Sequence, residues 1–182
     1  TNATVYICME YMEGGSLADM IKKYGPMSPD LAKNCLMQSL SGLEYLHAQG
    51  VIHRDIKGKN ILSTKNGLVK LADFGCAFFK AGQDTNELTA VAGSPFWMAP
   101  EIIEQSSSPT TACDIWSLGC TLIEVLTGKP PYANLEPMSA LYHMCSDERL
   151  LDHVTFPLGA SDPIIIAFLE MCLQKQPDRR AK

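Results

Sequence analysis

The sequence predicts an α+β fold that is mainly helical and carries one or two small β-hairpins in a single compact unit. Three observations carry this prediction: a helical repeat of apolar residues over residues 28–50, an Asn-Gly pair between two β-like runs, and an almost wholly apolar helix over residues 112–127. The chain has 182 residues, of which 46% are hydrophobic and 19% charged. A domain of this length buries roughly 70% of its unfolded surface, so a substantial core is expected.

Charge and cysteine usage exclude several classes of protein. The net charge is -5 and the pI is about 5.3, which argues against a nucleic-acid or anionic-membrane surface. The seven cysteines are an odd number without a C-x-x-C pair, a pattern typical of free thiols in a reducing compartment. Residues 1–4 are not a signal peptide, and no apolar run is long enough to span a membrane. These features predict a cytoplasmic protein without a membrane span.

The first 50 residues predict one strand and two helices. Residues 5–9 are β-branched and aromatic, which indicates a buried strand that the glycines at 14 and 15 break. A short helix follows and stops at Gly25 and Pro26. Ser28, Pro29 and Asp30 then predict the start of a long helix, and Gly50 predicts its end. Its apolar face repeats every three or four residues: Leu31, Cys35, Leu36, Leu40, Leu43 and Leu46.

A hairpin is predicted around Asn66 and Gly67, between strands at 61–63 and 68–72. If these two residues form the turn, Asn60 lies directly opposite Asp73, subject to twist and to a slip of one residue. An amide oxygen beside a carboxylate suits a hard cation such as Mg²⁺.

The second half predicts a long irregular segment followed by three helices. Residues 73–109 lack periodicity and exceed an ordinary connection, which indicates a functional or switchable loop. The apolar helix 112–127 belongs in the core, and Gly128 ends it. Another helix follows Pro137, and a last one starts at Asp162 and Pro163. Its predicted buried face consists of Ile164, Ile165, Phe168, Leu169, Met171 and Cys172.

Residues 53–60, here called the polar loop, place an acid, basic side chains and an amide within eight residues. Around them stands a fixed order of motifs: His53-Arg54-Asp55, then Asn60, then Asp73-Phe74-Gly75, then Ala99-Pro100-Glu101, then residues 114–119, and finally Arg180. This order resembles the protein-kinase catalytic domain over essentially the whole chain. Residues 9–17, 55–60 and 93–101 look like the versions found in the MAP kinase kinase kinase and sterile-20-like group.

The resemblance implies a kinase-like fold in which residues 1–12 are the end of the small lobe and the hinge, and residues 13–182 are the mainly helical large lobe, truncated near its C-terminus. It also implies an ATP-dependent phosphotransferase. Asp55 accepts the proton of the substrate hydroxyl, Lys57 offsets the charge of the transferred γ-phosphoryl, and Asn60 and Asp73 hold Mg²⁺. The remaining expected contacts to ATP are Met9, Glu10, Met12, Ser16 and Leu62. For Met9 and Leu62 alone, core packing would be the default.

The same resemblance assigns the activation segment and the structural residues. Arg54 beside Asp55 is the feature associated with activation by loop phosphorylation, for which Thr89 is the first candidate and Thr85 the next. Lys57 and the Ser94 hydroxyl fit the serine/threonine pattern, which dual-specificity enzymes share. The structural set contains His53, Phe74, Asp114 and a buried ion pair of Glu101 with Arg180. Asp114 can accept backbone N–H groups, pair with a base, or simply start a helix.

Compared with a whole kinase domain, the match starts at the last small-lobe strand, without a Gly-rich loop or the strand lysine. The sequence therefore predicts a fragment that is inactive alone, taken from a kinase that phosphorylates a protein substrate, which could be a downstream kinase. An upstream activating kinase is a further expected partner. A pseudokinase or scaffold is the alternative, and a hydrolase using His53 and Asp55 is disfavoured because no nucleophile motif accompanies them.

Overall fold

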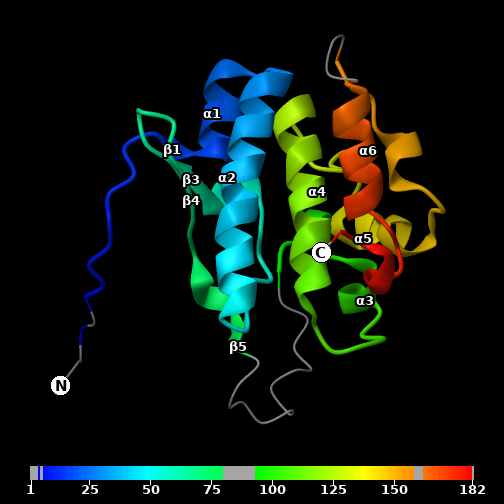
Figure 1. The fold of residues 1–182 in the computed structure, drawn as a ribbon. Helices are drawn as coiled ribbons and strands as arrows, with labels where there is room; N and C mark the ends of the chain where they lie inside the picture. Colours follow the sequence, from blue (N-terminus) through cyan, green and yellow to red (C-terminus); the bar gives the residue numbers. More distant parts are fainter. Residues whose placement is uncertain (1–3, 5, 80–92, 158–161, 182) are drawn as a thin grey trace.

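The computed structural model describes residues 4, 6–79, 93–157 and 162–181. Its main helices lie side by side: α2 (Pro29–Ala48), α4 (Thr111–Thr127) and α6 (Pro163–Cys172), with α4 in the middle (Figure 1). α1 (Leu17–Tyr24) packs against α4 and the turn η1 (Gly58–Asn60), while α3 (Pro100–Ile103) and α5 (Pro137–Ser146) lie on the far side of α4 from α2. Within the described ranges, no helix is both long and apolar enough to cross a membrane.

The strands are short and form two small antiparallel sheets. One sheet joins β1 (Gly15–Ser16), β3 (Ile61–Ser63) and β4 (Val69–Leu71) in that order. The other pairs β2 (Val51–Ile52) with β5 (Phe78–Phe79). β2 lies just before the polar loop, and β5 lies just after residues 73–76. Their pairing therefore brings the start of the loop next to the segment that follows Asp73. The mainly helical α+β prediction is therefore confirmed, although β1, β2 and β5 were not predicted.

The helix ends follow the capping signals in the sequence. Ser28 accepts a hydrogen bond from Leu31 N at the start of α2, and Asp162 accepts one from Ile164 N at the start of α6. Ser16 and Asp19 form a capping box at α1. The predicted helices at 28–50, at 112–127, after Pro137 and from Pro163 are all confirmed.

The register of the hairpin differs by one residue from the prediction. Ile61 lies opposite Leu71, and Ala72 N donates to Asn60 O at 2.9 Å. The reason is the loop, which has three residues: Thr64 pairs with Leu68, and Gly67 takes the left-handed conformation (φ 80°) that closes it. Asn60 is therefore opposite Ala72, and the predicted direct pairing with Asp73 is wrong.

The predicted strand at residues 5–9 is also wrong where the structure describes it. Residues 6–9 have no regular structure, and Tyr6 and Met9 are 86% and 83% exposed. A strand needs a neighbour to pair its backbone N–H and C=O groups. In the part of the chain that is described, no strand lies beside residues 6–9. A β-like composition without a partner leaves the segment extended along the outside of the molecule (Figure 1).

The core is centred on α4, which is buried from Cys113 to Leu126. Trp116 and Leu126 have no measurable exposure. α2 and α6 cover two of its sides, which explains why its apolar residues occur all round the helix. For α6, the predicted face is correct at Ile165, Leu169 and Cys172 but wrong at Ile164 and Met171, which are exposed because α6 has a neighbour on only part of its surface.

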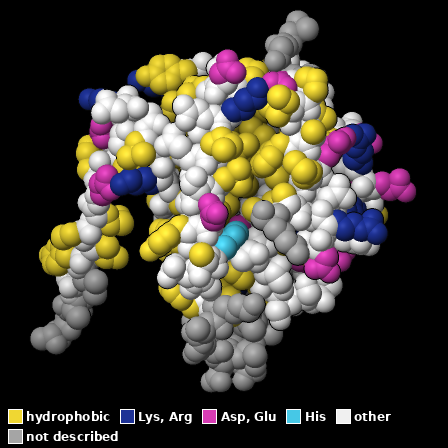
Figure 2. Space-filling model, viewed as in Figure 1, with side chains coloured by type: hydrophobic (Ala, Val, Ile, Leu, Met, Phe, Trp, Pro, Cys, Tyr) yellow, Lys and Arg dark blue, Asp and Glu magenta, His cyan; other side chains and the backbone are white. Residues whose placement is uncertain are grey.

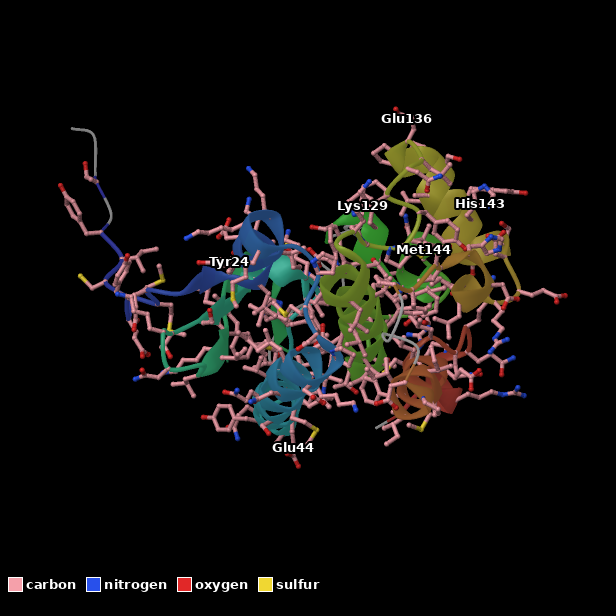
Figure 3. The ribbon with its side chains drawn as sticks, turned by 90° about the horizontal axis from the view of Figure 1, so that it is seen from above. Tyr24, Glu44, Lys129, Glu136, His143 and Met144 are labelled. Atoms are coloured by element: carbon pink, nitrogen blue, oxygen red, sulfur yellow. The ribbon has the colours of Figure 1, made fainter. Side chains whose placement is uncertain are left out.

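A polar cluster holds α5 to the segments before and after it. Asp147 accepts a hydrogen bond from Tyr132 Oη at 2.7 Å, and His143 Nδ1 and His153 Nε2 lie 3.1 Å and 3.2 Å from the same carboxylate. Tyr132 takes an unusual left-handed backbone conformation (φ 56°) and stacks on His143. Seen from above, His143 lies on the outer side of α5, while the buried Met144 faces the body (Figure 3).

Candidate active site

Three polar side chains bond to the Asp55 carboxylate in the polar loop. Lys57 Nζ and Asn60 Nδ2 each donate to Asp55 Oδ2 at 2.8 Å, and Ser94 Oγ donates to Oδ1 at 2.8 Å. Lys57 Nζ also donates to Ser94 Oγ at 2.6 Å. Asp55 is buried and Lys57 half-buried, so this carboxylate lies beside a fixed cation and near the surface. Such an arrangement can orient a hydroxyl group and receive its proton.

Asp114, at the start of α4, fixes the first half of the polar loop. Its carboxylate accepts backbone hydrogen bonds from His53 N at 2.9 Å and Arg54 N at 2.8 Å. His47 Nε2 of α2 lies 2.8 Å from Asp114 Oδ2. Asp114 is fully buried. The two alternatives suggested by the sequence, bonding to backbone N–H groups and pairing with a base, are therefore both realised.

Glu124, near the end of α4, fixes the second half of the loop. Glu124 Oε2 accepts from Gly58 N at 2.9 Å and from Trp97 Nε1 at 3.0 Å. Burial raises the pKa of this carboxyl, while the two N–H groups and Lys57 act in the opposite direction. A Cβ atom on Gly58 would lie 2.8 Å from Glu124 Oε1, so any other residue there would displace the Glu124 carboxylate. Glu124 is not among the residues predicted for the site; the signal in the sequence was a second carboxylate on a largely apolar helix.

His53 and Arg54 lie inside the same network. The fully buried His53 ring contacts Phe74, with ring centroids 5.1 Å apart, and its Nε2 lies 3.1 Å from Ala72 O. Arg54 has a left-handed backbone (φ 63°), and its Nε donates to Cys76 O at 2.6 Å. Both side chains thus connect the polar loop to the segment that follows Asp73.

Asn60 and Asp73, the predicted Mg²⁺ ligands, stand in different surroundings. Asn60 is buried and uses its Nδ2 on Asp55, which leaves the amide oxygen as an acceptor. Asp73 is exposed, and its Oδ1 accepts from Gly75 N at 3.3 Å. Among the described residues, no group of three or more His, Cys, Asp and Glu side chains could hold a metal. A carboxylate and an amide oxygen nevertheless match the donors that Mg²⁺ takes.

The residues expected to contact the nucleotide lie along the N-terminal segment and β3. Met9 and Glu10 are exposed, and Glu10 pairs with Lys70 of β4 at 2.6 Å, whereas Met12 is buried. The Ser16 hydroxyl is used in the α1 capping box, where it donates to Asp19 at 2.6 Å. Leu62, opposite Ser16 in the sheet, is half-buried. Met9 and Glu10 thus make no hydrogen bond to the residues of the Asp55 network within the described structure.

Of the activation-segment residues, only Arg54 and Ser94 lie within the described structure; Thr85 and Thr89 fall outside the described residues. Gly93 precedes Ser94 with φ 127°, and a Cβ there would lie 2.8 Å from Arg54 O. The segment therefore passes directly against the polar loop. After Ser94 the chain turns through η4 (Pro95–Trp97), and Ser117 of α4 donates to Trp97 O at 2.7 Å.

Glu101 and Arg180 form the expected buried ion pair. Arg180 Nη1 and Nη2 donate to the two carboxylate oxygens at 2.6 Å and 2.7 Å. The Arg180 guanidinium also donates to three backbone carbonyls, and it lies 5.0 Å from the centre of the Trp116 ring. The two side chains are 0% and 5% exposed. This pair attaches the C-terminal η6 (Pro177–Arg179) to α3.

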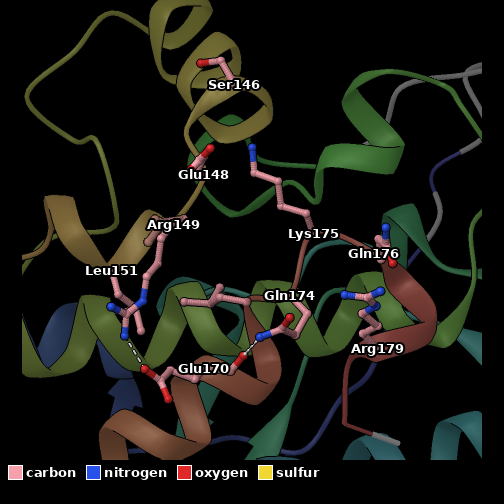
Figure 4. A pocket seen from close by; sticks show the side chains of 11 residues that line it. Ser146, Glu148, Arg149, Leu151, Glu170, Gln174, Lys175, Gln176 and Arg179 are labelled. Carbon is pink, nitrogen blue, oxygen red and sulfur yellow. Dashed lines mark hydrogen bonds and ion pairs between the residues drawn. The ribbon is translucent and has the colours of Figure 1, made fainter.

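Two of the hollows among the described residues lie outside the Asp55 network. One, of about 880 Å³, is bounded by the ends of α5 and α6, and Arg149 pairs with Glu170 at its edge (Figure 4). The other, of about 680 Å³, follows the mostly apolar face between α2 and α6 (Figure 2). Neither is lined by any predicted site residue.

Comparison with known proteins gives one family over the whole chain. The sequence profile described as "Protein kinase domain" matches residues 1–182. "Cytokinesis protein sepH" of Aspergillus niger is 54% identical over 177 residues, covering 97% of this chain and 13% of that protein. "Cell division control protein 7" of Schizosaccharomyces pombe is 50% identical and covers 100% of this chain and 16% of that protein. "MAP3K epsilon protein kinase 2" of Arabidopsis thaliana is 50% identical, and the match covers 99% of this chain and 13% of that protein. The chain thus spans about one-eighth to one-sixth of the length of these relatives.

Proposed function

The chain belongs to the protein kinase domain family, and from this premise we propose that it carries the phosphoryl-transfer loop of a serine/threonine protein kinase. The observation that supports this most directly is the Asp55 carboxylate, held between Lys57, Asn60 and Ser94 in a loop anchored by two buried acids of α4. In this proposal the reaction transfers the γ-phosphoryl of ATP to a serine or threonine hydroxyl of a protein.

Each polar group has a distinct part in the proposed reaction. Asp55 orients the acceptor hydroxyl and takes its proton, which requires position more than basicity. Lys57, already 2.8 Å from Asp55, offsets the negative charge of the phosphoryl group. Bound Mg²⁺–ATP supplies the phosphoryl group and a leaving group whose charge the metal neutralises. Asn60 and Asp73 are the proposed Mg²⁺ ligands, since their oxygens suit that ion.

The nucleotide base is proposed to lie along Glu10, Met12, Ser16 and Leu62, with Met9 behind them. Residues 1–12 are in this view the end of the small lobe and the hinge, and residues 13–182 the large lobe. A cytoplasmic enzyme in a MAP kinase kinase kinase-like cascade, with a protein kinase as substrate, is the finer proposal. The relative named "MAP3K epsilon protein kinase 2" supports it.

A phosphorylation assay on the complete protein tests the activity. The protein receives Mg²⁺–ATP and peptide libraries whose only acceptor is serine, threonine or tyrosine. We expect transfer to serine and threonine, and a fall in kcat of about 10²–10⁴-fold in Asp55→Asn, because the hydroxyl loses its proton acceptor. Asp152→Asn, an exposed acid outside the polar loop, is the matched control and should leave kcat unchanged.

Two results would contradict the proposal. Equal activity of Asp55→Asn and Asp152→Asn would show that Asp55 takes no part in the reaction. Absence of transfer to any acceptor by the intact complete protein would favour a pseudokinase or scaffold instead.

A further inference from the structure

A third hollow adjoins the polar loop. It has a volume of about 380 Å³ and lies between α1 and the end of α4. Glu124, which accepts a hydrogen bond from Gly58 N of the loop at 2.9 Å, is one of its lining residues. The turn η1, which forms the second half of the loop, contacts both helices. This hollow is therefore a direct neighbour of the candidate active site.

Three exposed lysines surround this hollow, and we call them the lysine rim. Lys22 of α1 and Lys129, which follows α4, belong to the lining, and Lys59 is the central residue of η1. Lys22 and Lys59 act on the same carboxylate: hydrogen bonds from Ser16 lower the pKa of Asp19 most, and the charges of the two lysines lower it further. The three positive charges are thus gathered around one small area.

The acids near the lysine rim are already bound within the protein. Asp19 Oδ2 accepts from Ser16 Oγ at 2.6 Å and from Ser16 N at 3.2 Å. Glu124 is only 7% exposed and accepts from two N–H groups. Among the described residues, the lysines and arginines that form ion pairs with acids are Lys33, Lys57, Lys70, Arg149 and Arg180. The rim therefore presents positive charge to solvent on a chain whose net charge is -5.

The lysine rim is within reach of a substrate whose hydroxyl lies at Asp55. Lys59 follows Asp55 by four residue steps, which span at most about 14 Å. An extended peptide covers a similar distance in about four residues. Because the rim occupies one place relative to Asp55 and a bound peptide has a fixed direction, the rim should meet residues on one side of the acceptor only.

We propose that the lysine rim selects protein substrates that carry an aspartate or glutamate within about four residues of the acceptor serine or threonine, on one side of it. The inference rests on the proposed kinase function and names the substrate class of that site. Each pair of exposed charges should change affinity by up to about fivefold, and the effect should weaken as salt is added. Because the contact is remote from the transferred group, it should act mainly on KM.

Kinetics of the complete protein with Mg²⁺–ATP test the selection. Each peptide has one serine in an alanine background, and a glutamate, alanine or lysine is placed in turn at each of the four positions before and after it. We expect glutamate at the best position to raise kcat/KM over alanine by about 3–20-fold, mainly through KM. This ratio should fall towards 1 as the NaCl concentration rises.

Lysine variants assign the preference to the rim. Lys22→Ala, Lys59→Ala and Lys129→Ala should each lower the ratio of kcat/KM for the glutamate peptide to that for the alanine peptide by about 2–5-fold. Lys59→Glu should favour the lysine peptide at the same position, which a mere disturbance of the loop would not do. Lys23→Ala is the matched control: Lys23 lies next to Lys22 but outside the lining of the hollow, with its Nζ over the Tyr24 ring. It should leave the ratio unchanged.

The outcomes distinguish the two proposals. Equal kcat/KM for glutamate, alanine and lysine peptides at every position would overturn the selection and leave the kinase function standing. A preference for glutamate that survives in all three lysine variants would also overturn it. If no peptide receives phosphate, the proposed kinase function fails. Fluorescence anisotropy of labelled peptides with alanine in place of the acceptor serine then tests the rim: tighter binding of glutamate peptides that the lysine variants lose would support it, and equal affinities would overturn it.

Discussion

Removal of the Arg180 side chain should destabilise the protein more than any exposed substitution. In Arg180→Ala, Glu101 stays buried without its bidentate partner, and three backbone carbonyls lose their donor. Breaking a buried pair by removing one partner costs about 3–5 kcal/mol. That is a large part of the roughly 5–15 kcal/mol that a folded domain has in total. For a cooperative unit of this size, the melting temperature should fall by about 6–20 °C.

Thermal and urea unfolding of the complete protein measure this effect. Arg179→Ala is the matched control, because Arg179 is the neighbouring residue and is exposed. Its free energy of unfolding should change by less than about 0.5 kcal/mol. The double variant Glu101→Ala/Arg180→Ala should be less destabilised than the sum of the single variants, since no charge is then left unpaired. Equal melting temperatures for Arg180→Ala and Arg179→Ala would refute the reasoning.

Two further predictions concern the polar loop and the α5 cluster. Gly58→Ala should lower stability by about 1–3 kcal/mol and reduce kcat, because the new Cβ would lie 2.8 Å from Glu124 Oε1. Gly42→Ala in α2, where the Cβ would meet only the movable Leu71 side chain at 3.2 Å, is the control, and similar losses in both would contradict this account. Asp147→Asn should be less stable than the wild type at pH 7, because Tyr132 and then His143 lower the pKa of Asp147 in the folded state. This stabilisation is present above the unfolded pKa of about 3.9 and is lost as the pH falls through the lower folded value. The urea midpoints of the two proteins should therefore approach each other as the pH is lowered from 7 to 3. A difference that stays constant with pH would show that the charge of the Asp147 carboxylate is not the source of the stabilisation.

The helices could be predicted because their signals are local. Ser28 with Pro29, the apolar repeat of α2 and the glycine after α4 each act within one or two helical turns. The hairpin was predicted only to within one residue, since Asn-Gly allows a loop of two or three residues and the sequence does not decide between them. For residues 6–9 the prediction failed, because a strand forms only beside a partner strand, and the local sequence does not show whether one is present.

The candidate site was predictable where residue types stand in a fixed order, as in the polar loop. The acids that hold the polar loop in place were harder to predict. Asp114 could be identified as an acceptor from its place at a helix start, but the choice of His53 N, Arg54 N and His47 as donors depends on how α2 and α4 pack. Glu124 could not be assigned at all, because an acid near the end of a largely apolar helix does not reveal which backbone group will face it.

The two acids of α4 also hold the polar loop at two separate points. Asp114 and Glu124 are ten positions apart, which corresponds to about 15 Å along a helix. Their backbone partners, Arg54 N and Gly58 N, are joined by four residue steps, which reach at most about 14 Å. One helix thus fixes two separate points of the loop, Arg54 N and Gly58 N. Insertion of one residue between Asp114 and Glu124 would turn one acid by about 100° relative to the other and leave the loop without one of its ends.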